Sequence, residues 1–170
     1  GAMNEGFADY FAASLLNEHR HGFFRSGPEG SDYRDLENDR RYPDDYYTGA
    51  LDFGGVHLNA SIFSGTLWDI RQALEPEVTD EIIVRAFELN ATNSLDGIHF
   101  SSFCGDLTRA DDIAYGDANL SNGSPHLTSI CSACERHGII TPLCRVCTSD
   151  EPDNDGDGWL NSCDFCPSVP

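Results

Sequence analysis

The chain carries Asp52 and His57 five residues apart, on either side of the pair Gly54–Gly55. Because glycine lets the backbone turn tightly, this pair can hold His57 at a fixed point near the start of the helix that follows. Asp52 can then accept a hydrogen bond from one imidazole nitrogen and leave the other nitrogen facing a cleft. Such an arrangement would suit a histidine that does chemistry, although a histidine near a helix start is more often a plain polar residue.

Two acidic side chains near the start of the chain form a second candidate group. Glu5 and Asp9 lie four residues apart within an expected helix over 4–18, so both project from the same side of that helix. In isolation, such a pair is better explained as two solvated carboxylates.

Considered together, the two groups resemble a known arrangement. The strings Asn4-Glu5-x-x-x-Asp9 and Asp52-x-Gly-Gly-Val-His57 occur in this order, some fifty residues apart. They resemble the N-E-x-x-x-D helix and the D-x-G-G-V-H turn in the C-terminal lobe of thermolysin-like and fungalysin-like zinc metallopeptidases. The resemblance covers about residues 1–120 and implies a helical lobe that takes part in zinc-dependent peptide-bond hydrolysis.

The resemblance assigns a role to each of these residues. Glu5 would be the third zinc ligand, and Asp9 would support the site by accepting a hydrogen bond from a ligating histidine. His57, oriented by Asp52, would donate a hydrogen bond to the oxyanion that forms at the scissile carbonyl.

The resemblance also implies a substrate-binding arginine, which we expect to be Arg34. Its planar fork of donors suits the binding of a peptide carbonyl at the edge of the cleft. Arg40 and Arg41 are competing candidates, and a surface salt bridge is the alternative role.

The sequence contains no H-E-x-x-H, the helix motif that supplies two zinc-ligating histidines and the general base in this family. We therefore expect the chain to be the C-terminal part of a longer peptidase, joined to an upstream catalytic segment, and to be inactive alone. One alternative is a non-catalytic secreted module whose function is calcium binding and interaction. Another is a cysteine zinc-ribbon adaptor.

The last segment of the chain has the oxygen-rich spacing of a calcium-binding loop. Gly158 falls where such a loop turns sharply, and the C-D-x-C-P ending resembles a thrombospondin type 3 repeat more than an EF-hand. A disordered acidic tail is the alternative. The expected calcium ligands are Asp153, Asp155, Asp157, the carbonyl of Trp159, Asn161 and Asp164.

Seven cysteines are present, six of them within the last forty residues. The pairs Cys131/Cys134 and Cys144/Cys147 fit either a small zinc ribbon or a disulfide knuckle. Crowded cysteines beside acidic sequence favour an oxidising, extracellular setting, so we expect disulfides and a secreted protein. The partner of Cys104 is left open.

The formal charge of the chain is −19, from 29 acidic and 10 basic residues, and all of the basic residues are arginine. Such a surface repels phosphate, which argues against nucleic acid or an anionic membrane as a partner. No stretch approaches the roughly 20 apolar residues of a membrane span.

Apolar periodicity predicts the elements that must position these groups, and it predicts an all-α fold. Helices are expected over 4–18, from His57 to Leu74, from Thr79 as N-cap, over 96–109 and over 110–118, with 22–49 mostly loop. His19–His21 are expected to interact with the C-terminal dipole of the first helix. The expected inward residues are Phe7, Tyr10, Phe11, Leu15, Phe63, Leu67, Ile70, Leu74, Ile82, Ile83, Ala86, Phe87, Leu89, Phe100, Phe103 and Leu107.

Composition changes along the chain suggest three parts. A helical lobe is expected over 1–120, a linker and cysteine-rich knuckle over 121–150, and a calcium-binding segment over 151–170.

Overall fold

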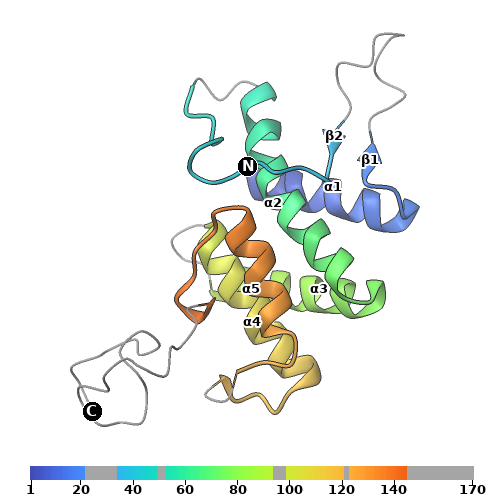
Figure 1. The fold of residues 1–170 in the computed structure, drawn as a ribbon, viewed down its shortest axis with the longest axis vertical. Helices are drawn as coiled ribbons and strands as arrows, with labels where there is room; N and C mark the ends of the chain where they lie inside the picture. The colour runs from blue at the N-terminus through green and yellow to red at the C-terminus, as the bar shows by residue number, and fades with distance from the viewer. Residues whose placement is uncertain (22–33, 50–52, 94–98, 121–122, 145–170) are drawn as a thin grey trace, which may run out of the picture.

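A computed structural model describes residues 1–21, 34–49, 53–93, 99–120 and 123–144 (Figure 1). Within these residues the protein is all-α, as predicted, and none of the helices there is long and apolar enough to cross a membrane. The helices are α1 (Ala2–Leu16), α2 (Phe53–Ala73), α3 (Pro76–Asn93), α4 (Phe100–Tyr115), α5 (Leu127–Arg136) and the short 3-10 helix η2 (Pro142–Cys144). A short antiparallel pair, β1 (Arg20–His21) and β2 (Arg34–Asp35), was not predicted.

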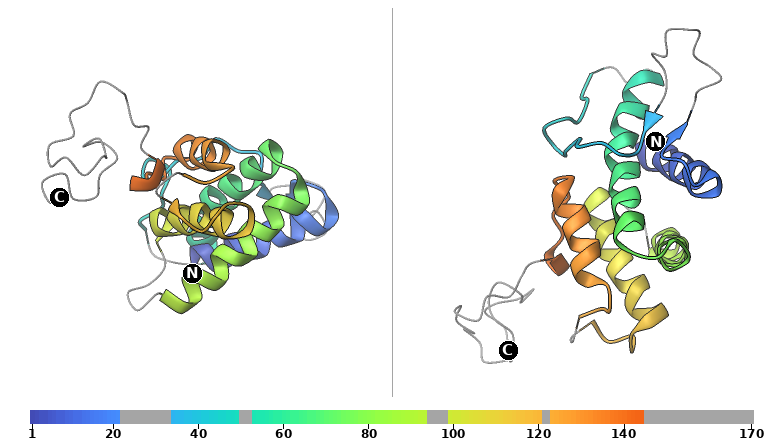
Figure 2. Two further views of the ribbon diagram at one scale, coloured as in Figure 1. Left: turned by 90° about the horizontal axis from the view of Figure 1, so that it is seen from below. Right: turned by 45° about the vertical axis from the view of Figure 1, so that its right-hand side comes forward.

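The five α-helices share one large hydrophobic core, and Ala13, Leu36 and Trp68 form a smaller buried cluster beside it. α1 packs along α2, α3 packs along α4, and α5 contacts both α2 and α4 (Figures 1 and 2). Phe7 of α1 lies at the centre of an aromatic cluster, where its ring centroid is 5.0 Å from that of Phe63 and 5.0 Å from that of Phe103. Edge-to-face contacts of this kind add specificity to the burial of apolar area.

α1 starts and ends two residues earlier than expected. Phe7 and Tyr10 are buried as predicted, whereas Phe11 is 36% exposed and Leu15 is 87% exposed, so the inward position of these two was wrong. Each step of four residues advances about 40° around a helix, and two such steps carry Leu15 off the buried face.

The expectation for the histidines after α1 was also wrong. No basic residue lies in the last turn of α1. Instead, Nδ1 of His19 lies 2.7 Å from Oδ1 of Asp35, beside the β1–β2 pair. His19 therefore ties this short ladder together rather than capping the helix.

α2 is longer than predicted. It begins at Phe53, so Gly54–Gly55 belong to its first turn and do not form a separate turn before it. Within the predicted part, Phe63, Leu67 and Ile70 are fully buried and Leu74 is partly buried, as expected.

α3 begins at Pro76, not at Thr79. Proline is favoured at the first helical position because its missing N–H is not needed there. Thr79 is internal to the helix, and its hydroxyl donates to the carbonyl of Glu75 at 3.2 Å. The expected inward side is correct for Ile82, Ile83 and Ala86 and for the partly buried Leu89, but Phe87 is 44% exposed.

A single helix, α4, replaces the two that were expected over 96–118. Phe100, Phe103 and Leu107 are buried as predicted.

Within the described residues the four cysteines form disulfides, as expected, and not a zinc ribbon. Cys131 pairs with Cys144, and Cys104 of α4 pairs with Cys134 of α5. α5 was not predicted as a helix, yet Ile130, Ala133 and Cys134 belong to the common core. Cys147, Cys163 and Cys166 lie outside the described residues.

Candidate functional site

Glu5 and His57 meet where α1 crosses α2. Nδ1 of His57 lies 3.4 Å from Oε2 of Glu5, with side chains 27% and 43% exposed respectively. The close approach depends on Gly6, where an added Cβ would lie 2.8 Å from the Phe63 ring and 3.0 Å from the carbonyl of Ala60. A small residue beside Glu5 thus lets α1 approach α2 one turn beyond His57.

Asp9 and Arg34 form the second pair of the site. The guanidinium of Arg34 donates to the carboxylate of Asp9, whose side chain is 4% exposed. β2 holds Arg34 in place, because Arg34 pairs with His21 of β1. Arg34 is therefore anchored on α1 one turn after Glu5.

The two competing arginines are used elsewhere. Arg40 donates to the carbonyl of Asp45 at 3.1 Å, and Arg41 donates to the carbonyl of Arg136. Of the three candidates, Arg34 is the one that the structure brings to the helix face carrying Glu5.

Several predicted site residues lie outside the described residues. Asp52 is one of them, and within the described part of the chain the buried Nδ1 atom of His57 has no hydrogen-bond partner. The expected calcium ligands Asp153, Asp155, Asp157, Trp159, Asn161 and Asp164 also lie outside.

The described residues can supply one carboxylate ligand, that of Glu5, to a zinc ion. Catalytic zinc sites have three protein ligands and an open position for water. The described ranges contain no cluster of three or more metal-ligating side chains. The carboxylate of Glu5 is accessible, however, and an imidazole lies beside it.

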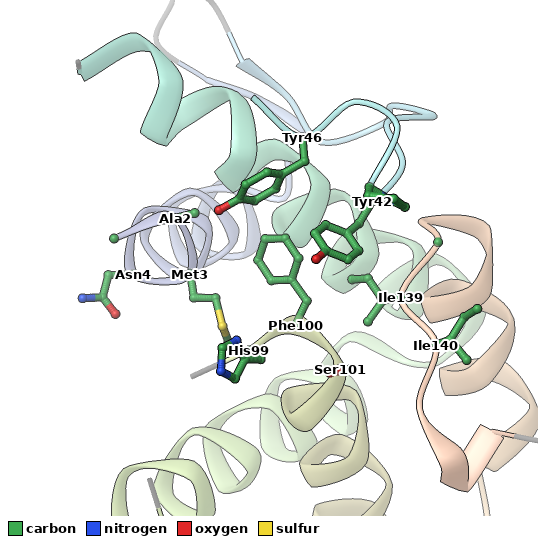
Figure 3. Close-up of a pocket in the computed structure, with 13 residues that line it drawn as sticks. Ala2, Met3, Asn4, Tyr42, Tyr46, His99, Phe100, Ser101, Ile139 and Ile140 are labelled. Carbon is green, nitrogen blue, oxygen red and sulfur yellow. The ribbon is translucent and has the colours of Figure 1, made fainter. Parts of the chain in front are cut away.

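Sequence reasoning missed a cavity of about 760 Å³ at the start of α1 (Figure 3). The rings of Tyr42, Tyr46 and Phe100 gather at this cavity, and Asn4, which precedes Glu5, lies on its rim. The signal that could have indicated it is the concentration of tyrosines around the Tyr42–Pro43 turn.

It also missed Asn59, which lies two residues after His57 and is 1% exposed. Its amide makes two hydrogen bonds to the backbone of Tyr47. Asparagine is uncommon in a helix interior, because its side chain competes for the hydrogen bonds of the backbone. Its presence within the expected helix is the signal that could have indicated this residue.

Comparison with known proteins gives one informative similarity. The chain is 28% identical over 158 residues to neutral protease B of Bacillus subtilis, and the match covers 82% of this chain and 28% of that protein. The chain thus spans about 28% of the length of this relative. No protein-family model matches the chain, and no solved structure matches it. The chain is therefore distantly similar to part of a bacterial protease, in agreement with the resemblance seen in its motifs.

Proposed function

We propose that this chain is part of a secreted zinc metalloendopeptidase, in which it supplies Glu5 as a zinc ligand and His57 as a hydrogen-bond donor to the substrate. The observation that carries the proposal is the 3.4 Å approach of the Glu5 carboxylate to the His57 imidazole. These residues are some fifty positions apart in the sequence and come from different helices. The distant similarity to a protease supports the same conclusion.

When bound, zinc would polarise the scissile carbonyl and lower the pKa of the attacking water. Glu5 would hold the metal on the face of α1 that meets α2. His57 would donate a ring N–H to the oxygen of the scissile carbonyl as negative charge builds there. Arg34, held by Asp9, would donate to a peptide carbonyl of the substrate, and Asp52 would keep the His57 ring oriented.

The two histidine ligands and the general base would come from a polypeptide segment outside these 170 residues, because the sequence contains no H-E-x-x-H. We therefore expect the 170-residue chain to leave casein intact. Hydrolysis of casein by the isolated chain that stops with 1,10-phenanthroline would contradict this division of the site.

The paired cysteines support an oxidising, extracellular location for the protein. We further propose that the segment after residue 150 binds calcium, on the sequence pattern alone. Calcium titration of the chain, with Asp157→Asn as the variant, tests this assignment, and unchanged affinity in the variant would contradict it.

The catalytic roles are tested in the protein as its source makes it. Glu5→Gln should remove zinc and activity together, whereas Glu77→Gln, which removes an equal charge from the exposed start of α3, should change neither. His57→Ala should retain zinc and lower kcat by about 10²–10³. Retention of zinc and full activity in Glu5→Gln, or normal kcat in His57→Ala, would overturn the proposal.

A further inference from the structure

The side-chain amide of Asn59 forms two hydrogen bonds with the backbone of Tyr47, which lies twelve positions earlier. Its Oδ1 accepts a hydrogen bond from the N–H of Tyr47 at 2.7 Å, and its Nδ2 donates to the carbonyl of Tyr47 at 3.0 Å. Asn59 itself is 1% exposed. Both polar atoms of a buried amide are therefore satisfied by one loop residue, which fixes Tyr47 in place beside α2.

These two hydrogen bonds also hold the ring of Tyr47 against the first turn of α2. An added Cβ at Gly55 would lie 2.5 Å from Cδ1 of Tyr47, and one at Gly49 would lie 2.3 Å from its hydroxyl. A side chain at either position would have to displace the ring of Tyr47. The ring thus covers the helix two residues before His57.

This turn needs outside support. The first N–H groups of a helix have no partners within it, and Gly54–Gly55 lose more conformational freedom on folding than other residues would. A helix that begins Phe-Gly-Gly is therefore prone to fraying at its start. Fraying there would move His57 away from Glu5.

We propose that Asn59 and Tyr47 are positioning residues that hold the first turn of α2 so that His57 stays beside Glu5. The importance of that geometry for catalysis rests on the function proposed above. The geometry itself can be measured in the 170-residue chain without any activity.

The test compares four variants of the isotopically labelled chain by NMR at one fixed pH. Asn59→Asp keeps the shape of the side chain but loses the donor to Tyr47, and Tyr47→Ala removes the ring. Tyr47→Phe keeps the ring, and Ser61→Ala removes a different side-chain hydrogen bond from the same helix. The readouts are the nuclear Overhauser contact between the His57 ring and the Glu5 side chain, and amide hydrogen exchange along α2.

Asn59→Asp and Tyr47→Ala should each lose the His57–Glu5 contact and speed exchange at residues 55–58 by about tenfold or more, with α4 and α5 unchanged. Tyr47→Phe and Ser61→Ala should behave like the unmodified chain. Retention of the contact, or an equal increase in exchange across all helices, would overturn the proposal. If Asn59→Asp fails to fold, Tyr47→Ala and Tyr47→Phe still decide the outcome.

In the active protein, Asn59→Asp should lower kcat with little change in KM, because the donor is misplaced while substrate contacts remain. Loss of the His57–Glu5 contact with kcat unchanged would contradict the proposed function and leave the positioning role intact.

Discussion

Arg71 and Asp80 form an ion pair in which Arg71 is the more buried member. Removing the carboxylate of Asp80 should therefore lower the free energy of unfolding more than removing the guanidinium of Arg71. Nη1 of Arg71 lies 2.8 Å from Oδ1 of Asp80, and the side chains are 7% and 38% exposed respectively. The hydroxyls of Tyr10 and Ser14 also donate to Asp80, at 2.6 and 2.9 Å. The cluster joins α1, α2 and α3 at one point.

Asp80→Asn should leave the buried guanidinium of Arg71 without its carboxylate. Losing one partner of a buried pair costs about 3–5 kcal/mol, and we expect about 3 kcal/mol because the amide oxygen still accepts a hydrogen bond. Arg71→Met should cost about 1 kcal/mol, because Asp80 keeps two hydroxyl donors and is partly solvated. In a protein of this size these losses lower Tm by about 6–12 °C and 2–4 °C respectively.

A double-mutant cycle in urea denaturation, with the disulfides intact, measures the asymmetry. In the Arg71→Met background, Asp80→Asn should cost about 1 kcal/mol or less, since no buried cation remains to be stranded. An Arg71→Met cost equal to or above that of Asp80→Asn would show that unequal burial does not control the stability of this ion pair. So would a coupling energy below about 0.5 kcal/mol.

Two further predictions concern stability. Replacing Cys104 and Cys134 by alanine should lower the free energy of unfolding by about 3.6 kcal/mol, and the Cys131/Cys144 replacement by about 2.9 kcal/mol, because the first disulfide closes the longer loop, 30 residues against 13. Denaturation of each double variant measures both values, and the reverse order would contradict the loop argument. Burial, and then the hydrogen bond to Asp80, raises the pKa of Tyr10 well above its usual range. As the pH rises, the unfolded chain therefore loses the Tyr10 proton before the folded chain does. The stabilisation from the Tyr10 hydroxyl is complete below about pH 10 and decreases as the pH rises further. Tyr10→Phe should cost about 1–2 kcal/mol at pH 7, with a smaller deficit at pH 10.5, and a constant deficit would contradict this origin.

Prediction from the sequence was most successful for residues that share one face of a helix. The spacing of Glu5 and Asp9 placed both carboxylates on the same side of α1, and the structure shows them one turn apart there. The stripe of Phe63, Leu67 and Ile70 likewise predicted the buried face of α2. These patterns depend only on helix periodicity.

Prediction from the sequence failed where contacts between distant segments decide the structure. Gly54–Gly55 read as a turn, because nothing local shows that Tyr47 and Asn59 lie beside the first turn of α2. The link from Cys104 to Cys134 could not be chosen either, since cysteine spacing does not fix connectivity.

The helix α5 was missed for a related reason. Gly, Ser and Pro before it and closely spaced cysteines within it read as a knuckle. Its helical state is supported by packing of Ile130 and Ala133 into the common core, which is a tertiary effect.

We propose above that Glu5 completes a zinc site together with residues from outside these 170 positions. The most direct measurement is the zinc content of the protein as its source makes it, determined together with its intact mass. We expect one zinc per molecule and a mass well above 18.7 kDa. A protein of 18.7 kDa without zinc would contradict it.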